Sequence, residues 1–126
     1  MTDTFNSEKA AASAWFRRLR DDIVSRFEAM EAQHDIDVPC GTFTVTPTQR
    51  TAEDGSDAGG GLMSVMRGGR VFEKVGVNVS TVFGTLGARA QEAMAARKGI
   101  LGMRDDPRFW AAGISLVAHM QNPHCP

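Results

Sequence analysis

The stretch from Leu62 to Val79, LMSVMRGGRVFEKVGVNV, decides the fold. Residues 62–67 and 70–79 are both rich in apolar side chains, and Gly68-Gly69 separates them. Two glycines between extended segments suit a tight hairpin turn with positive φ. Strands joined by such a turn pair antiparallel, so the stretch predicts an antiparallel hairpin.

Two helices are predicted on either side of this hairpin. The first covers residues 6–33, where Asn6 or Ser7 can cap the helix. The second covers the alanine-rich residues 86–98, with Gly99 as its C-terminal stop. The apolar residues of the first helix recur at spacings of three and four and form one stripe: Phe16, Leu19, Ile23, Phe27 and Met30.

The remaining segments are shorter. Residues 42–46, TFTVT, alternate and predict a strand, whereas the polar, glycine-rich residues 51–61 predict a loop. Asp106-Pro107 looks like the start of a short helical turn over residues 107–112. Residues 114–119, ISLVAH, predict a last strand.

Together these elements predict an α+β fold, an antiparallel sheet flanked by helices. We find no internal domain boundary. Residues 1–38 should be mainly helical, and residues 39–126 should form the sheet, with a helix near 86–98. Because nothing follows the last strand to cover it, we expect the chain to be the N-terminal part of one larger domain.

Composition excludes several classes of protein. The formal net charge is -1, so no basic excess favours nucleic acid. The apolar stretches are far short of a membrane span, so we expect no transmembrane segment. The first residues lack the apolar core of a secretory signal, which predicts a cytoplasmic protein. Cys40 and Cys125 stand in unrelated contexts, as expected of reduced thiols.

The glycine run at residues 59–61 is not a phosphate-binding motif. A P-loop ends in Gly-Lys-Ser/Thr, and a dinucleotide fingerprint lies between a strand and a helix. Neither context is present here. A flexible turn, or close approach of the backbone to a bulky ligand, explains the glycines better.

Ser115 and His119 are the candidate binding residues of the last strand. Side chains alternate along a strand, so both should lie on one face, about 13 Å apart. That separation is too large for a nucleophile–base pair but suits two contacts with one extended ligand. Taken singly, each is better explained without a ligand, Ser115 as a polar residue of a half-buried strand and His119 as a surface or hydrogen-bonded histidine. His119 and His124 could also bind a metal ion, but the spacing shows no third ligand.

Two longer strings carry a family resemblance. The run GGRVFEKVGVNVSTVFG at residues 68–84, the glycines before it and GISLVAHMQNPHCP at residues 113–126 occur in the same order in oxygen-dependent coproporphyrinogen III oxidases. The chain resembles this family over about residues 58–126 and more loosely over the first helix. It departs from the family at Met63-Ser64, where Ser-Arg is frequent, and at Phe83, where histidine is common.

The resemblance implies a homodimeric enzyme with a broad antiparallel sheet. It oxidatively decarboxylates coproporphyrinogen III to protoporphyrinogen IX in haem biosynthesis, with molecular oxygen as co-substrate and no required cofactor. Ser115 matches a substrate-contacting serine, and His119 matches a histidine proposed as a divalent metal ligand, although the need for a metal is open. The proton donor is expected beyond Pro126, so no catalytic residue is expected in this chain.

The substrate also needs positive partners for its carboxylates, and Arg67 or Arg70 are the candidates. Two hypotheses follow. The chain is part of an oxidase and inactive alone, or it is a non-catalytic remnant that binds a tetrapyrrole or serves as a structural module.

Overall fold

The computed structural model describes residues 5–97 and 105–125. In this part of the chain, two helices and four strands form an α+β fold, which confirms the predicted fold class. The elements are α1 (Asn6–Ala32), β1 (Phe43–Thr51), β2 (Asp57–Arg67), β3 (Phe72–Thr85), α2 (Ala88–Ala95) and β4 (Arg108–Met120).

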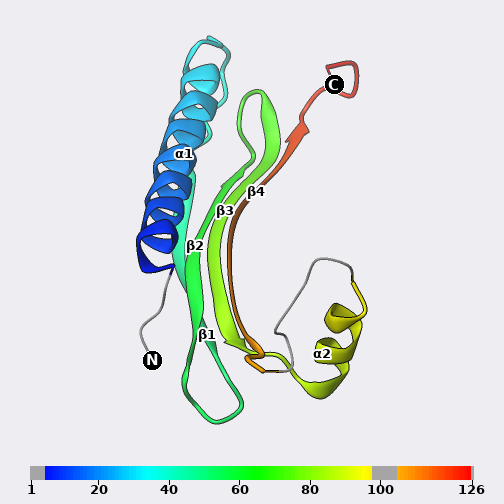
Figure 1. Ribbon diagram of the computed structural model, residues 1–126. Coiled ribbons are helices and arrows are strands. Elements are labelled where there is room, and N and C mark those ends of the chain that lie inside the picture. The colour runs from blue at the N-terminus through cyan, green and yellow to red at the C-terminus, as the bar shows by residue number, and fades with distance from the viewer. Residues whose placement is uncertain (1–4, 98–104, 126) are drawn as a thin grey trace.

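The four strands form one antiparallel sheet in the order β1-β2-β3-β4. Helix α1 lies along one face of this curved sheet, and the short helix α2 lies on the other side, near one end of the strands (Figure 1). No helix among the described residues is both long and apolar enough to cross a membrane.

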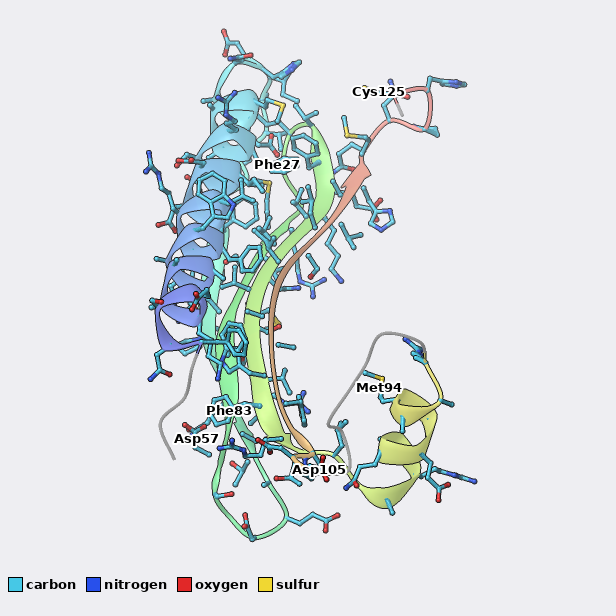
Figure 2. The ribbon with its side chains drawn as sticks, in the orientation of Figure 1. Phe27, Asp57, Phe83, Met94, Asp105 and Cys125 are labelled. Carbon is cyan, nitrogen blue, oxygen red and sulfur yellow. The ribbon has the colours of Figure 1, made fainter. Side chains whose placement is uncertain are left out.

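The hydrophobic core fills the space between α1 and the sheet. Phe27 points from α1 toward the strands (Figure 2) and packs edge-on against Phe72, with the ring centroids 4.8 Å apart. The predicted stripe of α1 therefore faces the sheet, except that Met30 is exposed and Glu31 is buried in its place. The buried apolar residues of the strands are Met66, Phe72, Val75, Val77 and Val79.

A bulge at Glu73 decides which side chains of β3 enter this core. The β3–β4 register shifts between Phe72 and Lys74. Strict alternation would place these two residues on one face, because they are two positions apart. The extra residue instead puts Phe72 in the core and leaves Lys74 on the opposite face, with His119 of β4 as its cross-strand neighbour.

The β2–β3 turn is longer than predicted. It spans residues 68–71, and the Gly69 N–H donates to the Phe72 carbonyl. Gly68 has the expected positive φ of 61°, but Gly69 is needed for space. A Cβ there would lie 1.7 Å from Oε1 of Glu31, which is tucked beneath the turn.

The loop predicted over residues 51–61 is wrong for its second half. The glycines at residues 59–61 lie inside β2, between β1 and β3. A Cβ at Gly61 would lie 1.9 Å from the Val79 carbonyl oxygen, and one at Gly60 would lie 2.3 Å from that of Thr48. The glycines therefore allow close approach of neighbouring strands.

The other boundaries also shifted. The helical turn predicted at residues 107–112 is wrong, because β4 starts at Arg108 and pairs with β3 throughout. Strand β1 extends to Thr51 and includes Pro47, which an edge strand tolerates. Helix α2 is shorter than the predicted residues 86–98, and Gly99 lies outside the described residues.

Candidate functional site on the open face of the sheet

The face of the sheet turned away from α1 carries most of the predicted site residues. Met66, Val75, Val77 and Ile114 face the helix, so the residues between them face the opposite way. We call this side the open face. Read across β2, β3 and β4 by register, its residues form successive rows: Arg67–Lys74–His119, Val65–Gly76–Val117, Met63–Asn78–Ser115 and Gly61–Ser80–Gly113.

The first row places three basic side chains side by side. Arg67 lies opposite Lys74, and Lys74 lies opposite His119, so the row crosses three strands. All three residues are exposed. Within residues 5–97 and 105–125, none of them makes a side-chain hydrogen bond or ion pair, and Glu73 in the bulge makes none with them.

The next row is apolar, and its central residue has no side chain above the sheet. Val65 and Val117 flank Gly76, and a Cβ added at Gly76 would meet no described atom within 4 Å. Gly113, two rows further along, has the same free space. The open face therefore offers a shallow apolar floor beside the basic row.

A polar pair lies in the row beyond this floor. Asn78 of β3 is the cross-strand neighbour of Ser115, and the Asn78 Oδ1 is buried without a hydrogen-bond partner in the described chain. Ser115 is exposed. Ser115 and His119 therefore share one face of β4, four residues apart, as the alternation predicted.

Arg70 lies apart from this arrangement, in the β2–β3 turn. Its Nη1 donates to the His34 carbonyl at 2.6 Å, and its Nε donates to the Val38 carbonyl. Its backbone N–H donates to Glu31 Oε2 at 2.7 Å. The side chain thus fastens the segment after α1, whereas Arg67 points from the strand onto the open face.

The two aspartates with lowered pKa values, Asp54 and Asp106, lie far from the basic row. A side-chain hydrogen bond from Arg108 holds the pKa of Asp106 below its ordinary value, and one from Ser56 lowers the pKa of Asp54. Both carboxylates lie at the other end of the sheet from the β2–β3 turn, Asp54 between β1 and β2 and Asp106 just before β4. They stay ionised at neutral pH without neutralising the row.

No group of three or more potential metal ligands occurs among the described residues. His124 lies in the turn after β4, where its backbone N–H donates to Asn122 Oδ1 at 2.9 Å. His119 has Lys74 as its neighbour instead. The ammonium group of this directly opposite residue favours an anion over a metal cation at His119.

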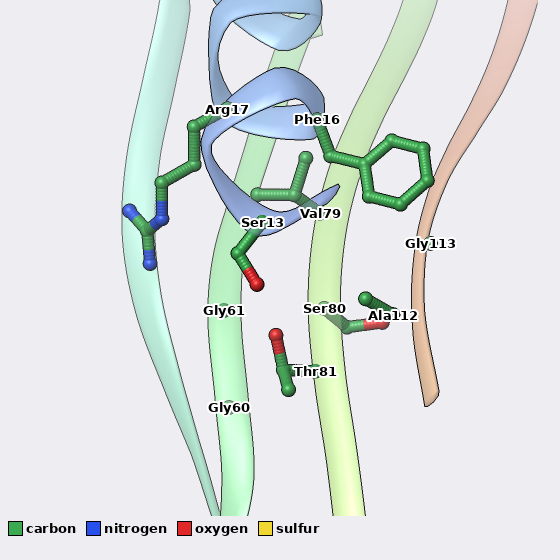
Figure 3. A pocket seen from close by; sticks show the side chains of 10 residues that line it. All are labelled: Ser13, Phe16, Arg17, Gly60, Gly61, Val79, Ser80, Thr81, Ala112 and Gly113. Carbon is green, nitrogen blue, oxygen red and sulfur yellow. The ribbon is translucent and has the colours of Figure 1, made fainter. Parts of the chain in front are cut away.

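A small hollow also exists on the helix side of the sheet. Ser13 and Arg17 of α1 border it, and Gly60, Gly61 and Thr81 form part of its floor (Figure 3). Its empty volume is about 240 Å³ including space open to solvent. The enclosed part holds about one water molecule, so it cannot take a large ligand.

The sequence predicted Ser115, His119 and Arg67 as binding residues, and all three lie on the open face. It did not point to Lys74 and Asn78, which lie beside them. Asn78 could have been found, because it pairs with Ser115 once the hairpin register is known. Lys74 could also have been found, because alternation counted back from Val77 and Val75 places it on the open face, although alternation counted from Phe72 does not.

Comparison with known proteins agrees with the resemblance. The sequence profile described as coproporphyrinogen III oxidase matches residues 11–126. Proteins named oxygen-dependent coproporphyrinogen-III oxidase from Rickettsia bellii (strain RML369-C) and Rickettsia felis are each 42% identical over 120 residues, and one from Rickettsia africae is 40% identical. Each match covers 94% of this chain but only 39% of the relative's length. The chain therefore belongs to the coproporphyrinogen III oxidase family.

Proposed function

We propose that the open face binds coproporphyrinogen III as part of an oxygen-dependent oxidase that converts it to protoporphyrinogen IX. The observation that supports this proposal is the order in which the rows of side chains follow one another on that face. A basic row, an apolar floor with a glycine at its centre, and the Asn78–Ser115 pair follow one another along the strands.

This order suits the chemistry of a porphyrinogen. The molecule is large and apolar, carries ionised propionates at its edge and has pyrrole N–H groups at its centre. Its carboxylates can meet Arg67 and His119 while a pyrrole lies over Gly76. An N–H group can then reach the polar pair, where Ser115 provides a hydroxyl acceptor.

The residues of this chain would bind and orient the substrate. Electron-rich pyrroles can react with oxygen without a redox cofactor once they are held and deprotonated, and the proposal assigns the proton transfer to residues beyond Pro126. By the same resemblance, the proposal includes a homodimer and a cytoplasmic location.

Coproporphyrin III, the stable oxidised form of the substrate, provides the test. Its fluorescence should change on titration with the wild-type chain. Replacing Ser115 by alanine should weaken binding by about 1 kcal/mol if one neutral hydrogen bond is lost. Thr48→Ala is the matched control, because Thr48 is a hydroxyl residue on the same face, on the edge strand β1. Absence of binding by the wild-type chain would overturn the proposal.

His119 has two proposed roles that one measurement separates. If His119 contacts a propionate, as its position beside Lys74 favours, His119→Ala should weaken porphyrin binding and a chelator should change nothing. If it holds a divalent metal, chelator treatment of the wild-type chain should weaken binding as much as the substitution does.

A further inference from the structure

The basic row has an energetic cost that the fold does not offset. Like charges on directly opposite residues of neighbouring strands destabilise a sheet. Here the Arg67 guanidinium and the Lys74 ammonium are such neighbours, and His119 follows on the other side. No acid of the described chain pairs with any of them, although the chain carries 15 acidic residues.

Lys74 lies at the centre of the row because the regular β2–β3 register pairs it with Arg67, on the face opposite the buried Val75. Bulges recur next to binding sites, where they redirect a side chain. The bulge at Glu73 directly precedes Lys74 and redirects Phe72 into the core, although Phe72 and Lys74 are two positions apart. The irregularity in β3 therefore lies directly beside the row of like charges.

We propose that Arg67, Lys74 and His119 form a carboxylate-binding subsite in which Lys74 is the residue that determines affinity. The inference rests on the proposed function, because it identifies the part of the open face that takes the propionates. Cβ atoms of direct neighbours lie about 4.5–5.5 Å apart, so Lys74 can share a carboxylate with either flanking residue. A bound anion supplies the negative charge that the fold omits.

The geometry also orients the ligand. The apolar row Val65–Gly76–Val117 lies two residues along the strands, at about 6.6 Å. A carboxylate held at Lys74 therefore leaves the carbon skeleton of the ligand over Gly76. Gly76 has no side chain and its Cβ position is free of other atoms, so a ring of the ligand can approach the backbone there.

The test compares variants of the whole 126-residue chain in coproporphyrin III titrations. Lys74→Met keeps the aliphatic stem and removes the charge, and we expect it to raise the dissociation constant about tenfold. Lys74→Arg should stay within about twofold of wild type, because the positive charge is retained. Arg50→Gln is the matched control: Arg50 is on the open face but pairs with Gly59, at the other end of β2, and its loss should change binding less than about twofold.

A second readout separates binding from folding. If the row is strained by repulsion, Lys74→Met should unfold at a higher temperature than wild type without ligand, while binding more weakly. The slope of log Kd against log salt concentration should also be shallower for Lys74→Met.

The outcomes are distinguishable. If the wild-type chain does not bind coproporphyrin III, the proposed function fails and this inference with it. If the wild-type chain binds but Lys74→Met and Arg50→Gln weaken binding equally, the proposed function stands and the subsite is refuted. A lower unfolding temperature for Lys74→Met would likewise overturn the repulsion on which the subsite is argued.

Discussion

At the scale of single residues, Glu31 is the least expected feature of the molecule. Its carboxylate is fully buried, and Oε2 accepts the N–H groups of Arg70 and Val71 at 2.7 and 3.0 Å. It thereby joins the end of α1 to the β2–β3 turn. Gln121 holds the same turn from the other side, donating from Nε2 to the Gly69 carbonyl and from its backbone N–H to the Val71 carbonyl.

This arrangement predicts a coupled pair of substitutions. Gly69→Ala should destabilise the chain by about 1–3 kcal/mol, because its Cβ cannot coexist with Glu31 Oε1 at 1.7 Å. Glu31→Ala should cost a similar amount by leaving the partly buried N–H groups of Arg70 and Val71 without their acceptor. In the Glu31→Ala background, the additional cost of Gly69→Ala should largely vanish, because the clashing oxygen is gone.

Urea unfolding of the four proteins measures this coupling. Gly76→Ala is the control, because its Cβ meets nothing within 4 Å and its φ is not positive. Strictly additive free energies of unfolding would show that Gly69 is not required for the Glu31 carboxylate.

At the scale of elements, the two edge strands of the sheet differ in how they are protected. β1 contains Pro47, which has no N–H group for pairing with another strand. β4 carries neither proline nor charge between residues 109 and 118, and Leu116 and Val117 are 47% and 57% exposed. Uncharged, apolar edge strands are sites of association.

We therefore predict that the chain associates through β4 as its concentration rises. Val117→Lys should reduce this association, because a charge on an edge strand disfavours strand pairing. Thr46→Lys places the same charge on β1 and should have little effect. Sedimentation velocity over a concentration series measures both variants, and a wild-type chain that stays monomeric throughout would contradict the prediction.

At the scale of the whole molecule, we expect this chain to bind a porphyrin without catalysing the oxidation of coproporphyrinogen III. The open face contains groups suited to hold a substrate, whereas the resemblance to the family leads us to expect the proton donor beyond Pro126. The chain also spans only 39% of the length of the relatives it matches. We predict that the 126-residue chain does not convert coproporphyrinogen III, even where it binds coproporphyrin III.

An aerobic assay with protoporphyrin fluorescence as the readout checks this prediction, with a full-length oxidase of the family as the positive control. Formation of protoporphyrin by the isolated chain above the rate of spontaneous oxidation would show that its own residues suffice for the chemistry.

The sequence by itself determined the features that depend on neighbours along the chain. A helical spacing of apolar residues was enough for α1, and two apolar runs around Gly68-Gly69 were enough for the central hairpin. The alternation of β4 correctly put Ser115 and His119 on one face. The long strings at residues 68–84 and 113–126 were enough to place the chain in its family, because many residues in order are far more specific than a short motif.

Only the tertiary structure decided the features that depend on a partner strand or helix. The glycines at residues 59–61 resemble a loop until the backbones of β1 and β3 are close enough to exclude a Cβ. Arg67 and Arg70 are equivalent in sequence, but one lies on the open face and the other fastens the segment after α1. Phe72 reaches the core through a bulge, which arises where two strands pair out of step. Such positions are set by contacts between distant segments, which local periodicity does not encode.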